Sequence, residues 1–269
     1  MGEPDRASAG GASFREARPL TGAAARDELR WRRHRAILAA ALDILTTDGH
    51  EGMTMHRIAD RLECGVASIY RLFPSKDALL AELQHDALRV LAASWAEGSR
   101  MLDETLAAAG ADERESALAR ALGAGWFWIA AEHRFSHEID LSRRVVVDRS
   151  TVVPADQAGR VLAVTLELLA TGQQALDGAV AVGALRPGNT VERAIVIISS
   201  IFGVTLTAKF SRWDLELFDG ERVASEALCD LFLAWGADPD ELARAAEIIR
   251  GEIAAGRLAP AVELTPTRP

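Results

Sequence analysis

The apolar positions of residues 54–76 fall into two short helical sets separated by a break. The first set recurs at i, i+3, i+4 and i+7 and comprises Met55, Ile58, Ala59 and Leu62. Thr54 precedes it as an N-cap, because its hydroxyl can accept a bond from an unpaired backbone N–H. After a break at residues 63–65, the period resumes with Val66, Ile69, Tyr70 and Phe73. Two helices of about eight residues joined by a short turn are typical of a helix-turn-helix, whose second helix can lie in a DNA major groove.

Helical periodicity continues on both sides of this motif. A preceding helix is predicted from residue 27 or 28 to 47, with Gly49 available for a left-handed cap. Ser75 is predicted to cap a helix that reaches residue 95 or beyond. Further helices are predicted at 101–109, 114–131, 135–148, 155–182, 190–213, 221–235 and 238–255. Since no strand pattern occurs, the predicted class is all-α: an N-terminal three-helix helix-turn-helix domain followed by a larger helical domain. That this larger domain is a ligand-binding and dimerisation domain is implied by the family resemblance described below.

We predict a DNA-binding domain at residues 27–76, with its motif at 54–73, and a helical domain at 77–257, for which the resemblance described below implies effector binding and dimerisation. Residues 1–26 are rich in Gly, Ala, Ser and Arg without a sustained period, which predicts a disordered tail. Residues 258–269 contain three prolines and are predicted to be loose.

The charge of the chain is unevenly distributed. The net charge is −9 over 269 residues, yet residues 14–76 hold eleven Arg or Lys against eight Asp or Glu, a balance of +3. Residues 1–13 carry −1, which leaves −11 on residues 77–269. This distribution favours local DNA contact by the N-terminal part, with the acidic body held away from phosphate.

The two cysteines, Cys64 and Cys229, are far apart and belong to no metal-spaced cluster, which favours a reducing compartment over a disulfide framework. Cys64 is interpreted as a small apolar residue that packs the turn, with a redox sensor as the alternative. No secretory signal pattern occurs, and the longest uncharged run, residues 194–208, has fifteen residues against the roughly twenty that a bilayer needs. We therefore expect a buried helix there and a cytoplasmic protein.

The string IADRL, three further residues and VASIYRLFPSKDALL resembles the DNA-binding segment of the tetracycline-repressor (TetR) family of transcriptional regulators. The resemblance rests on the spacing of Ile58-Ala59, Tyr70, Phe73, Ser75-Lys76 and Leu79. It covers roughly residues 32–91 well and the rest in outline. The alternative is an ordinary core segment of short helices.

The second motif helix is expected to expose Val66, Ala67, Ser68 and Arg71, of which only Arg71 can make a bidentate contact with guanine. A phosphate contact by Arg71 is the equal alternative. The resemblance implies phosphate contacts from Tyr70, the only tyrosine, from Lys76, from Thr54 and from Arg32 or Arg33 at the start of the first helix. The full candidate DNA-binding set is Arg33, Thr54, Arg57, Val66, Ala67, Ser68, Tyr70, Arg71 and Lys76.

Glu63 departs from the family pattern, which usually has glycine at this point of the turn. Glutamate tolerates a positive φ poorly, at about 1 kcal/mol. The sequence therefore leaves two possibilities: the turn is built differently, or Gly65 adopts the left-handed conformation.

In the body, aromatic and a few polar side chains suit an apolar or aromatic small molecule. The candidate effector-binding residues are Trp95, Met101, Trp126, Phe127, Trp128, His133, Phe135 and His137, with Leu168 and Leu169 nearby by resemblance. The resemblance also implies a two-fold dimer through the last long helices, with Ile195, Ile198, Phe202, Leu228, Leu231, Phe232 and Trp235 as candidates. Packing within the chain's own core is the alternative for both sets.

We interpret the chain as a ligand-responsive transcriptional regulator, specifically a repressor, that binds a palindromic double-stranded DNA operator as a homodimer and is released by a small apolar or aromatic effector. The sequence contains no motif for catalysis, metal or cofactor binding, and His133 and His137 lack a third ligand. A helical small-molecule-binding module without DNA activity, or an enzyme with an appended helical domain, are the alternatives.

Overall fold

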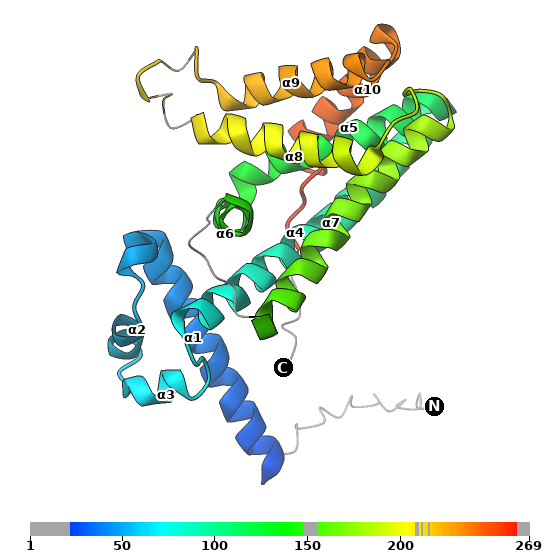
Figure 1. The fold of residues 1–269 in the computed structure, drawn as a ribbon. Helices are drawn as coiled ribbons and strands as arrows, with labels where there is room; N and C mark the ends of the chain where they lie inside the picture. Colours follow the sequence, from blue (N-terminus) through cyan, green and yellow to red (C-terminus); the bar gives the residue numbers. More distant parts are fainter. Residues whose placement is uncertain (1–21, 148–154, 208–209, 211, 215, 263–269) are drawn as a thin grey trace, which may run out of the picture.

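The computed structural model describes residues 22–147, 155–207, 210, 212–214 and 216–262. These residues form ten α-helices and no strand, which confirms the predicted all-α class (Figure 1). The helices are α1 (Ala23–Gly52), α2 (Met55–Arg61), α3 (Val66–Tyr70), α4 (Lys76–Ala109), α5 (Glu113–Arg134), α6 (Ser136–Val147), α7 (Ala155–Ala181), α8 (Thr190–Thr207), α9 (Gly220–Ala234) and α10 (Pro239–Ala254).

The helices α1, α2 and α3 and the start of α4 surround one hydrophobic cluster at one end of the molecule (Figure 1). Its fully buried side chains include Ile37, Ile44, Met53, Ile58, Ile69, Leu79 and Leu80. A second cluster fills the body, where α5 packs against α10, α7, α4, α8 and α9. Because α4 contributes Leu79 and Leu80 to the first cluster and Leu91 and Trp95 to the second, it joins the two units, and the boundary at residue 76 remains a prediction.

Four helix lengths differ from the sequence-based expectation. The helix α8, predicted to span residues 190–213, ends at Thr207. The helix α1 begins at Ala23, so residues 23–26 are helical where a disordered tail was predicted, and residues 1–21 lie outside the described residues. The helix α3 has only five residues, because Pro74 restricts the preceding backbone and the chain turns at residues 71–73. The helix α4 continues unbroken to Ala109 and includes the segment 101–109 that was predicted as a separate helix.

The predicted caps around the motif are present. The Thr54 hydroxyl accepts a hydrogen bond from the Arg57 backbone N–H at 3.2 Å, and the Ser75 hydroxyl accepts one from the Ala78 N–H at 3.0 Å. The backbone of Gly49 has φ 71° and ψ −175°, which interrupts the helical conformation near the end of α1. Glycine adopts this conformation without the steric penalty of a side chain.

Residues 258–260, which follow α10, pack into the body, which corrects the prediction of a loose tail for this part of it; residues 263–269 lie outside the described residues. Leu258, Ala259 and Pro260 are buried, and the Ser94 hydroxyl of α4 donates to the Pro260 carbonyl oxygen at 2.8 Å. The side chain of Glu252 is only 1% exposed and accepts hydrogen bonds from the Thr105 hydroxyl at 2.9 Å and from Nε of Arg257 at 3.0 Å. The apolar Leu258 side chain and these polar bonds fix the segment on α4.

The close contact between α4 and this C-terminal segment predicts the effect of enlarging Gly98. A Cβ atom at Gly98 would lie 2.2 Å from the Leu258 carbonyl oxygen, so the backbone of the C-terminal segment would have to shift. We expect Gly98→Ala to lower the free energy of unfolding by about 1–3 kcal/mol, measured by urea denaturation. The same change at Gly251 of α10, where no atom lies within 4 Å, should stabilise the helix by about 0.5–1 kcal/mol. A Gly98→Ala protein as stable as the wild type would contradict this contact.

The helix α8 is less buried than the sequence predicted. Ile195 and Leu206 are 48% and 45% exposed, and Val191 and Val196 are also exposed in the single chain. By length and composition alone, Thr190–Thr207 could cross a membrane, and 28% of this stretch is buried. Apolar core helices of soluble proteins meet the same criterion. The expectation of a buried helix is therefore wrong for one face of α8.

Candidate DNA-binding face and effector pocket

The turn between α2 and α3 is built around Glu63. Its φ is +49°, and among the described residues it is the one non-glycine residue with a positive φ. Gly65 has φ −69° and ψ 137°, so it does not adopt the left-handed conformation that was considered for it. Cys64 packs against the N-terminal hydrophobic cluster, in agreement with the interpretation that it packs the turn. The turn therefore keeps the backbone conformation that favours glycine while carrying a glutamate.

This conformation predicts that Glu63→Gly stabilises the protein. A residue with a side chain costs about 1–2 kcal/mol in the left-handed backbone conformation, and glycine avoids this cost. Glycine in turn lowers stability by about 0.5–1 kcal/mol, because it loses more conformational entropy on folding. The first effect is the larger one. We expect a gain of roughly 0.5–1 kcal/mol in the free energy of unfolding, read from a urea titration. Glu63→Ala removes the same carboxylate but keeps the strained backbone, so it should bring no such gain. A destabilised Glu63→Gly protein would contradict the argument.

The outer side of α3 is small and poor in hydrogen-bond donors. Ile69 is fully buried and anchors the helix in the N-terminal cluster. Ala67 is exposed and Val66 and Ser68 are half-buried, which leaves the Ser68 hydroxyl as the one polar side chain among residues 66–69. Tyr70 is 47% exposed at the end of the helix. This surface offers apolar contact to thymine methyl groups more readily than bidentate hydrogen bonds to bases.

Besides the Thr54 cap, two predicted DNA-binding cations have partners inside the domain. Nη2 of Arg57 lies 2.5 Å from a carboxylate oxygen of Asp48, and its Nη1 donates to the Gly52 carbonyl at 3.0 Å. Arg57 therefore braces the end of α1 against α2, and its predicted DNA contact gains no support. The Lys76 ammonium donates to the His50 carbonyl at 2.6 Å. An ammonium has three donors, so Lys76 keeps two for a phosphate at the N-terminus of α4.

His34 joins α1 to the chain that follows α3, a role that the sequence pattern did not indicate. Its ring stacks on Phe73 at 4.7 Å and on Trp31 at 5.8 Å between centroids. Burial lowers the pKa of His34; Glu82 opposes this with a smaller effect, and Arg35 lowers the pKa further. The neutral ring therefore packs as an aromatic spacer between α1 and the segment that follows α3.

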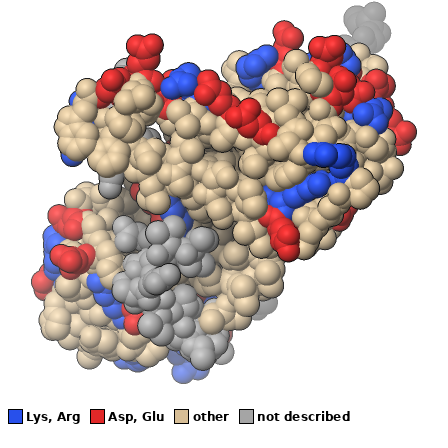
Figure 2. Space-filling view, turned by 45° about the horizontal axis from the view of Figure 1, so that its top comes forward, with Lys and Arg blue, Asp and Glu red and all other residues tan. Residues whose placement is uncertain are grey.

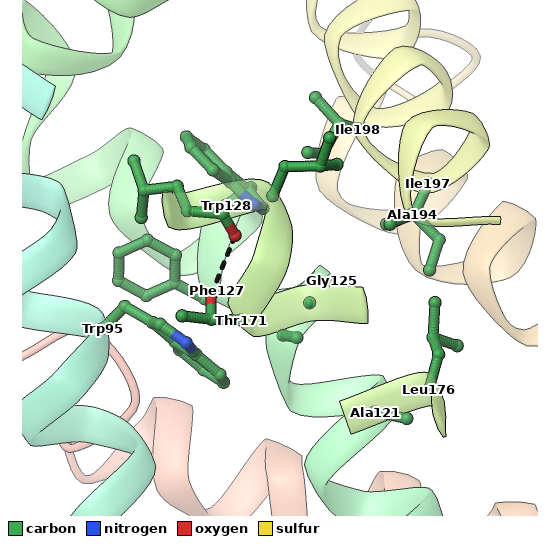
Figure 3. Close-up of a pocket in the computed structure, with 14 residues that line it drawn as sticks. Trp95, Ala121, Gly125, Phe127, Trp128, Thr171, Leu176, Ala194, Ile197 and Ile198 are labelled. Atoms are coloured by element: carbon green, nitrogen blue, oxygen red, sulfur yellow. Dashed lines mark hydrogen bonds between the residues drawn. The ribbon is translucent and has the colours of Figure 1, made fainter. Parts of the chain in front are cut away.

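A pocket lies in the body between α4, α5, α7 and α8 (Figure 3). Trp95, Phe127 and Trp128 line it with their rings, and Phe127 lies 5.4 Å from Trp95 and 5.7 Å from Trp128 between ring centroids. Thr171 contributes a hydroxyl, which donates to the Leu168 carbonyl of its own helix at 2.8 Å. The remaining lining is apolar or glycine: Ala121, Ala124, Gly125, Leu168, Leu169, Gly172, Leu176, Ala194, Ile197 and Ile198.

This pocket is nearly closed in the present conformation. Its cavity volume is only about 20 Å³. That is room for about one water molecule, far less than the roughly 300–1,000 Å³ of typical ligand pockets. An effector of drug-like size would therefore have to separate the helices that line the pocket.

Of the predicted effector-binding residues, the structure brings Trp95, Phe127, Trp128, Leu168 and Leu169 together in this pocket, and it places the other candidates elsewhere. Successive residues of α5 face different neighbouring helices, and the chain turns where α5 ends. Trp126 therefore borders a groove beside α9, Phe135 is buried at the end of α5, and His133 lies 3.3 Å from Glu221. Met101 is half-buried on α4, and His137 borders a cleft between α6, α1 and α4.

The predicted dimer residues also divide into two groups. Phe202, Leu228 and Phe232 are at most 5% exposed in the chain's own core, which corrects their assignment to an interface. Phe202 and Leu228 face α5, since the Phe202 ring lies 5.6 Å from the Trp128 ring between centroids and Leu228 lies beside Gly125. Ile195 is exposed, and Ile198, Leu231 and Trp235 are half-buried. Figure 2 shows a broad area of the body without charged side chains, bordered by acidic and basic ones.

One group among the described residues has the geometry of metal ligands, namely Glu82, His85 and Asp86 of α4, whose ligand atoms lie within 4.8 Å of one another. Both carboxylates already bind arginine: Glu82 pairs with Arg160 at 2.7 Å and Asp86 with Arg35 at 2.7 Å. These pairs neutralise the charge that would attract a cation. The group therefore links α4 to α7 and α1 rather than forming a metal centre.

Comparison with known proteins gives a family for the N-terminal segment. Residues 37–83 match the model of the family described as bacterial regulatory proteins, tetR family. This range contains α2, α3 and parts of α1 and α4, and the match confirms the resemblance to the tetracycline-repressor family that the motif predicted. None of the curated proteins compared with the chain matches it.

Two solved structures are similar to the chain. One is the crystal structure of PfmR, a TetR family transcriptional regulator from Thermus thermophilus, with 18% identity, a TM-score of 0.46 and coverage of 77% of this chain and 96% of PfmR. The other, from Mesorhizobium loti, bears a provisional description as a TetR-family transcriptional regulator, with 16% identity, a TM-score of 0.36 and coverage of 75% of this chain and 96% of that one.

Proposed function

We propose that this chain is a ligand-responsive transcriptional repressor that acts in the cytoplasm, binds a palindromic operator as a homodimer and is released by a small apolar or aromatic effector. The observation that carries the proposal is the helix-turn-helix unit of residues 54–73, within the segment that matches the tetR family. The matched family is one of regulatory proteins, and we propose no enzymatic activity and no cofactor.

The surface chemistry of the motif supports contact with DNA. Thr54 keeps its hydroxyl hydrogen for a phosphate while its oxygen caps α2, and the exposed Tyr70 ring places a second hydroxyl at the end of α3. Lys76 adds a cation at the N-terminus of α4, where the helix dipole also favours an anion. These three groups flank a recognition surface formed by Val66, Ala67 and Ser68. With so few hydrogen-bond donors on this surface, phosphate contacts would position the protein on the DNA, and the shape of the DNA would provide part of the specificity.

The helix α4 supports the proposed response to an effector, because one continuous helix reaches both sites. Lys76 lies at its first residue and Trp95 lines the pocket, and nineteen residues of α-helix separate them by about 28 Å. An effector that enters the closed pocket would push Trp95 and α4 away from α7. A tilt of α4 moves the N-terminal unit, since Leu79 and Leu80 belong to its core. The effector and the operator then favour different conformations, which is the thermodynamic basis of release.

The apolar residues that α8 and α9 expose support a homodimer. Ile195, Val196, Leu206 and Leu233 are each more than 40% exposed. Burial of such a face against a second copy places two recognition helices on one side of a two-fold assembly. Half-sites on a palindromic operator would then lie about 34–36 Å apart, or a multiple of this distance.

Selection of bound sequences from a random DNA pool tests the proposal. The expected result is enrichment of an inverted repeat whose half-sites are separated by a whole number of helical turns. A Tyr70→Ala/Lys76→Ala protein serves as the control, and it should enrich no motif while it keeps the wild-type helix content and elution volume. If the wild type enriches no sequence, the chain is better explained as a helical small-molecule-binding module without DNA activity.

A further inference from the structure

The N-terminal third of α1 extends past the helix-turn-helix unit and carries a row of arginines. Figure 1 shows this end of α1 protruding beyond α3, away from the body. Arg26, Arg30 and Arg33 recur at i, i+4 and i+7 and therefore share one face of the helix. Together with Arg71, Leu29 and Leu72 they line an open groove of about 540 Å³, which we call the arginine groove. All four arginines are exposed.

These four guanidinium groups differ from their neighbours on α1 by having no ion pair within the part of the chain that the structure describes. Arg32 pairs with Glu28 at 2.9 Å, and Arg35 pairs with Asp86 at 2.7 Å. Four like charges around one groove repel one another, so an anion placed between them is stabilised. The groove therefore suits a polyanion that follows α1.

The dimensions of the groove fit a DNA strand. Arg26 and Arg33 are seven residues apart, which corresponds to about 10 Å along the helix axis. Successive phosphates of one strand rise by about 3.4 Å along the DNA axis, so this stretch matches about three phosphates. Guanidinium groups bind phosphate oxygens with charge-assisted, often bidentate hydrogen bonds.

The position of Arg71 bears on whether it reads a base or the backbone. Arg71 follows the last residue of α3 and is the C-cap of that helix. In helix-turn-helix complexes the N-terminal residues of the recognition helix contact the base edges. Arg71 lies at the opposite end of α3 and lines the same groove as the arginines of α1.

From this arrangement we infer that Arg26, Arg30 and Arg33 of α1 and Arg71 form a phosphate clamp that grips the DNA backbone beside the recognition helix, and that Arg71 reads no base. This inference rests on the proposed DNA-binding function. In this arrangement the clamp provides most of the salt-dependent affinity for DNA. The short α3, which has few hydrogen-bond donors, provides the sequence preference.

The dependence of operator affinity on NaCl concentration tests the clamp, with the full-length chain and a duplex that carries the selected operator. The logarithm of the association constant falls with log[salt], and each lost phosphate contact should reduce the magnitude of this negative slope by about 0.9. Since a dimer carries two copies, Arg26→Ala/Arg30→Ala should reduce the magnitude by about 3.6 and Arg71→Ala by about 1.8. At about 0.15 M salt, Arg71→Ala should weaken binding by about thirtyfold. Arg100→Ala removes an equal charge from the distal part of α4 and should leave the slope unchanged.

The same titration on an unrelated duplex separates backbone contact from base reading. A phosphate contact by Arg71 predicts that Arg71→Ala weakens binding to both duplexes by the same factor, so that their affinity ratio is unchanged. A lower ratio with an unchanged slope would show that Arg71 reads a base and would overturn its place in the clamp. An unchanged slope for Arg26→Ala/Arg30→Ala would overturn the clamp while the proposed function stands. If the wild type binds neither duplex, the proposed function and the clamp both fall.

Discussion

Replacing Tyr70 with phenylalanine is expected to weaken operator binding by about 10²–10⁴-fold while the fold and the oligomeric state stay unchanged. The hydroxyl is removed but the ring remains, so the loss reports one hydrogen bond to phosphate. Such a bond to a charged group contributes about 1.5–3 kcal/mol, and a dimer contains two of them. Because Tyr70 is 47% exposed, the substitution leaves the core intact. The measurement is a binding titration at constant salt with the selected operator.

Tyr70→Ala extends the same experiment by removing the ring as well. We expect it to bind at least as weakly as Tyr70→Phe, since it lacks the same hydroxyl. Circular dichroism and size-exclusion chromatography should give wild-type results for both proteins. Wild-type affinity in both variants would show that Tyr70 is a surface residue without a role in DNA contact.

Replacing Phe127 with alanine is expected to cause the largest loss of stability in the body. The side chain is 1% exposed and lies between the rings of Trp95 and Trp128. Its removal leaves a cavity beside the closed pocket, which should lower the free energy of unfolding by about 3–5 kcal/mol. Urea denaturation followed by tryptophan fluorescence measures this change directly.

Phe127→Leu provides the matched control, because leucine keeps most of the volume and should cost less than about 1.5 kcal/mol. A Phe127→Ala protein as stable as the leucine variant would mean that the helices around the pocket collapse into the space. That outcome would contradict the view that the pocket can be held open by an effector without loss of the surrounding core.

The sequence predicted the helix-turn-helix well because its signals are local. The helical spacing of Ile58 and Ile69, the caps at Thr54 and Ser75 and the turn at Glu63 all depend on residues within one or two turns of each other. The resemblance to the tetracycline-repressor family rested on the same short stretch, and the family match covers it. Local spacing therefore sufficed for this unit.

The pocket and the ends of the chain were predicted less well because they depend on packing between distant segments. An aromatic run such as Trp126-Phe127-Trp128 does not show which ring faces α7 and which faces α9, since helical neighbours point in different directions. The composition of residues 258–260 indicated a loose tail, yet Ser94 and Gly98 of α4 form a seat for them. Burial of the interface candidates Phe202 and Phe232 likewise depends on where α5 lies.

The arginines show a third reason why sequence alone does not predict the site. From the sequence, Arg33, Arg57 and Arg71 were all candidates for contact with DNA, because charge alone does not reveal a partner inside the protein. In the structure Arg57 is bound to Asp48, whereas Arg33 and Arg71 line one open groove. Ion pairing between side chains on different helices separates a structural arginine from one that is available to DNA.

Equilibrium binding to two duplexes of equal length, one with the selected operator and one with the same bases in scrambled order, tests the central claim most directly. At about 0.15 M salt the account predicts a dissociation constant of about 10⁻⁸–10⁻¹¹ M for the operator and binding at least about 10³-fold weaker for the scrambled duplex. Equal affinity for the two duplexes, or no binding to either, would contradict the claim that this chain is a sequence-specific regulator.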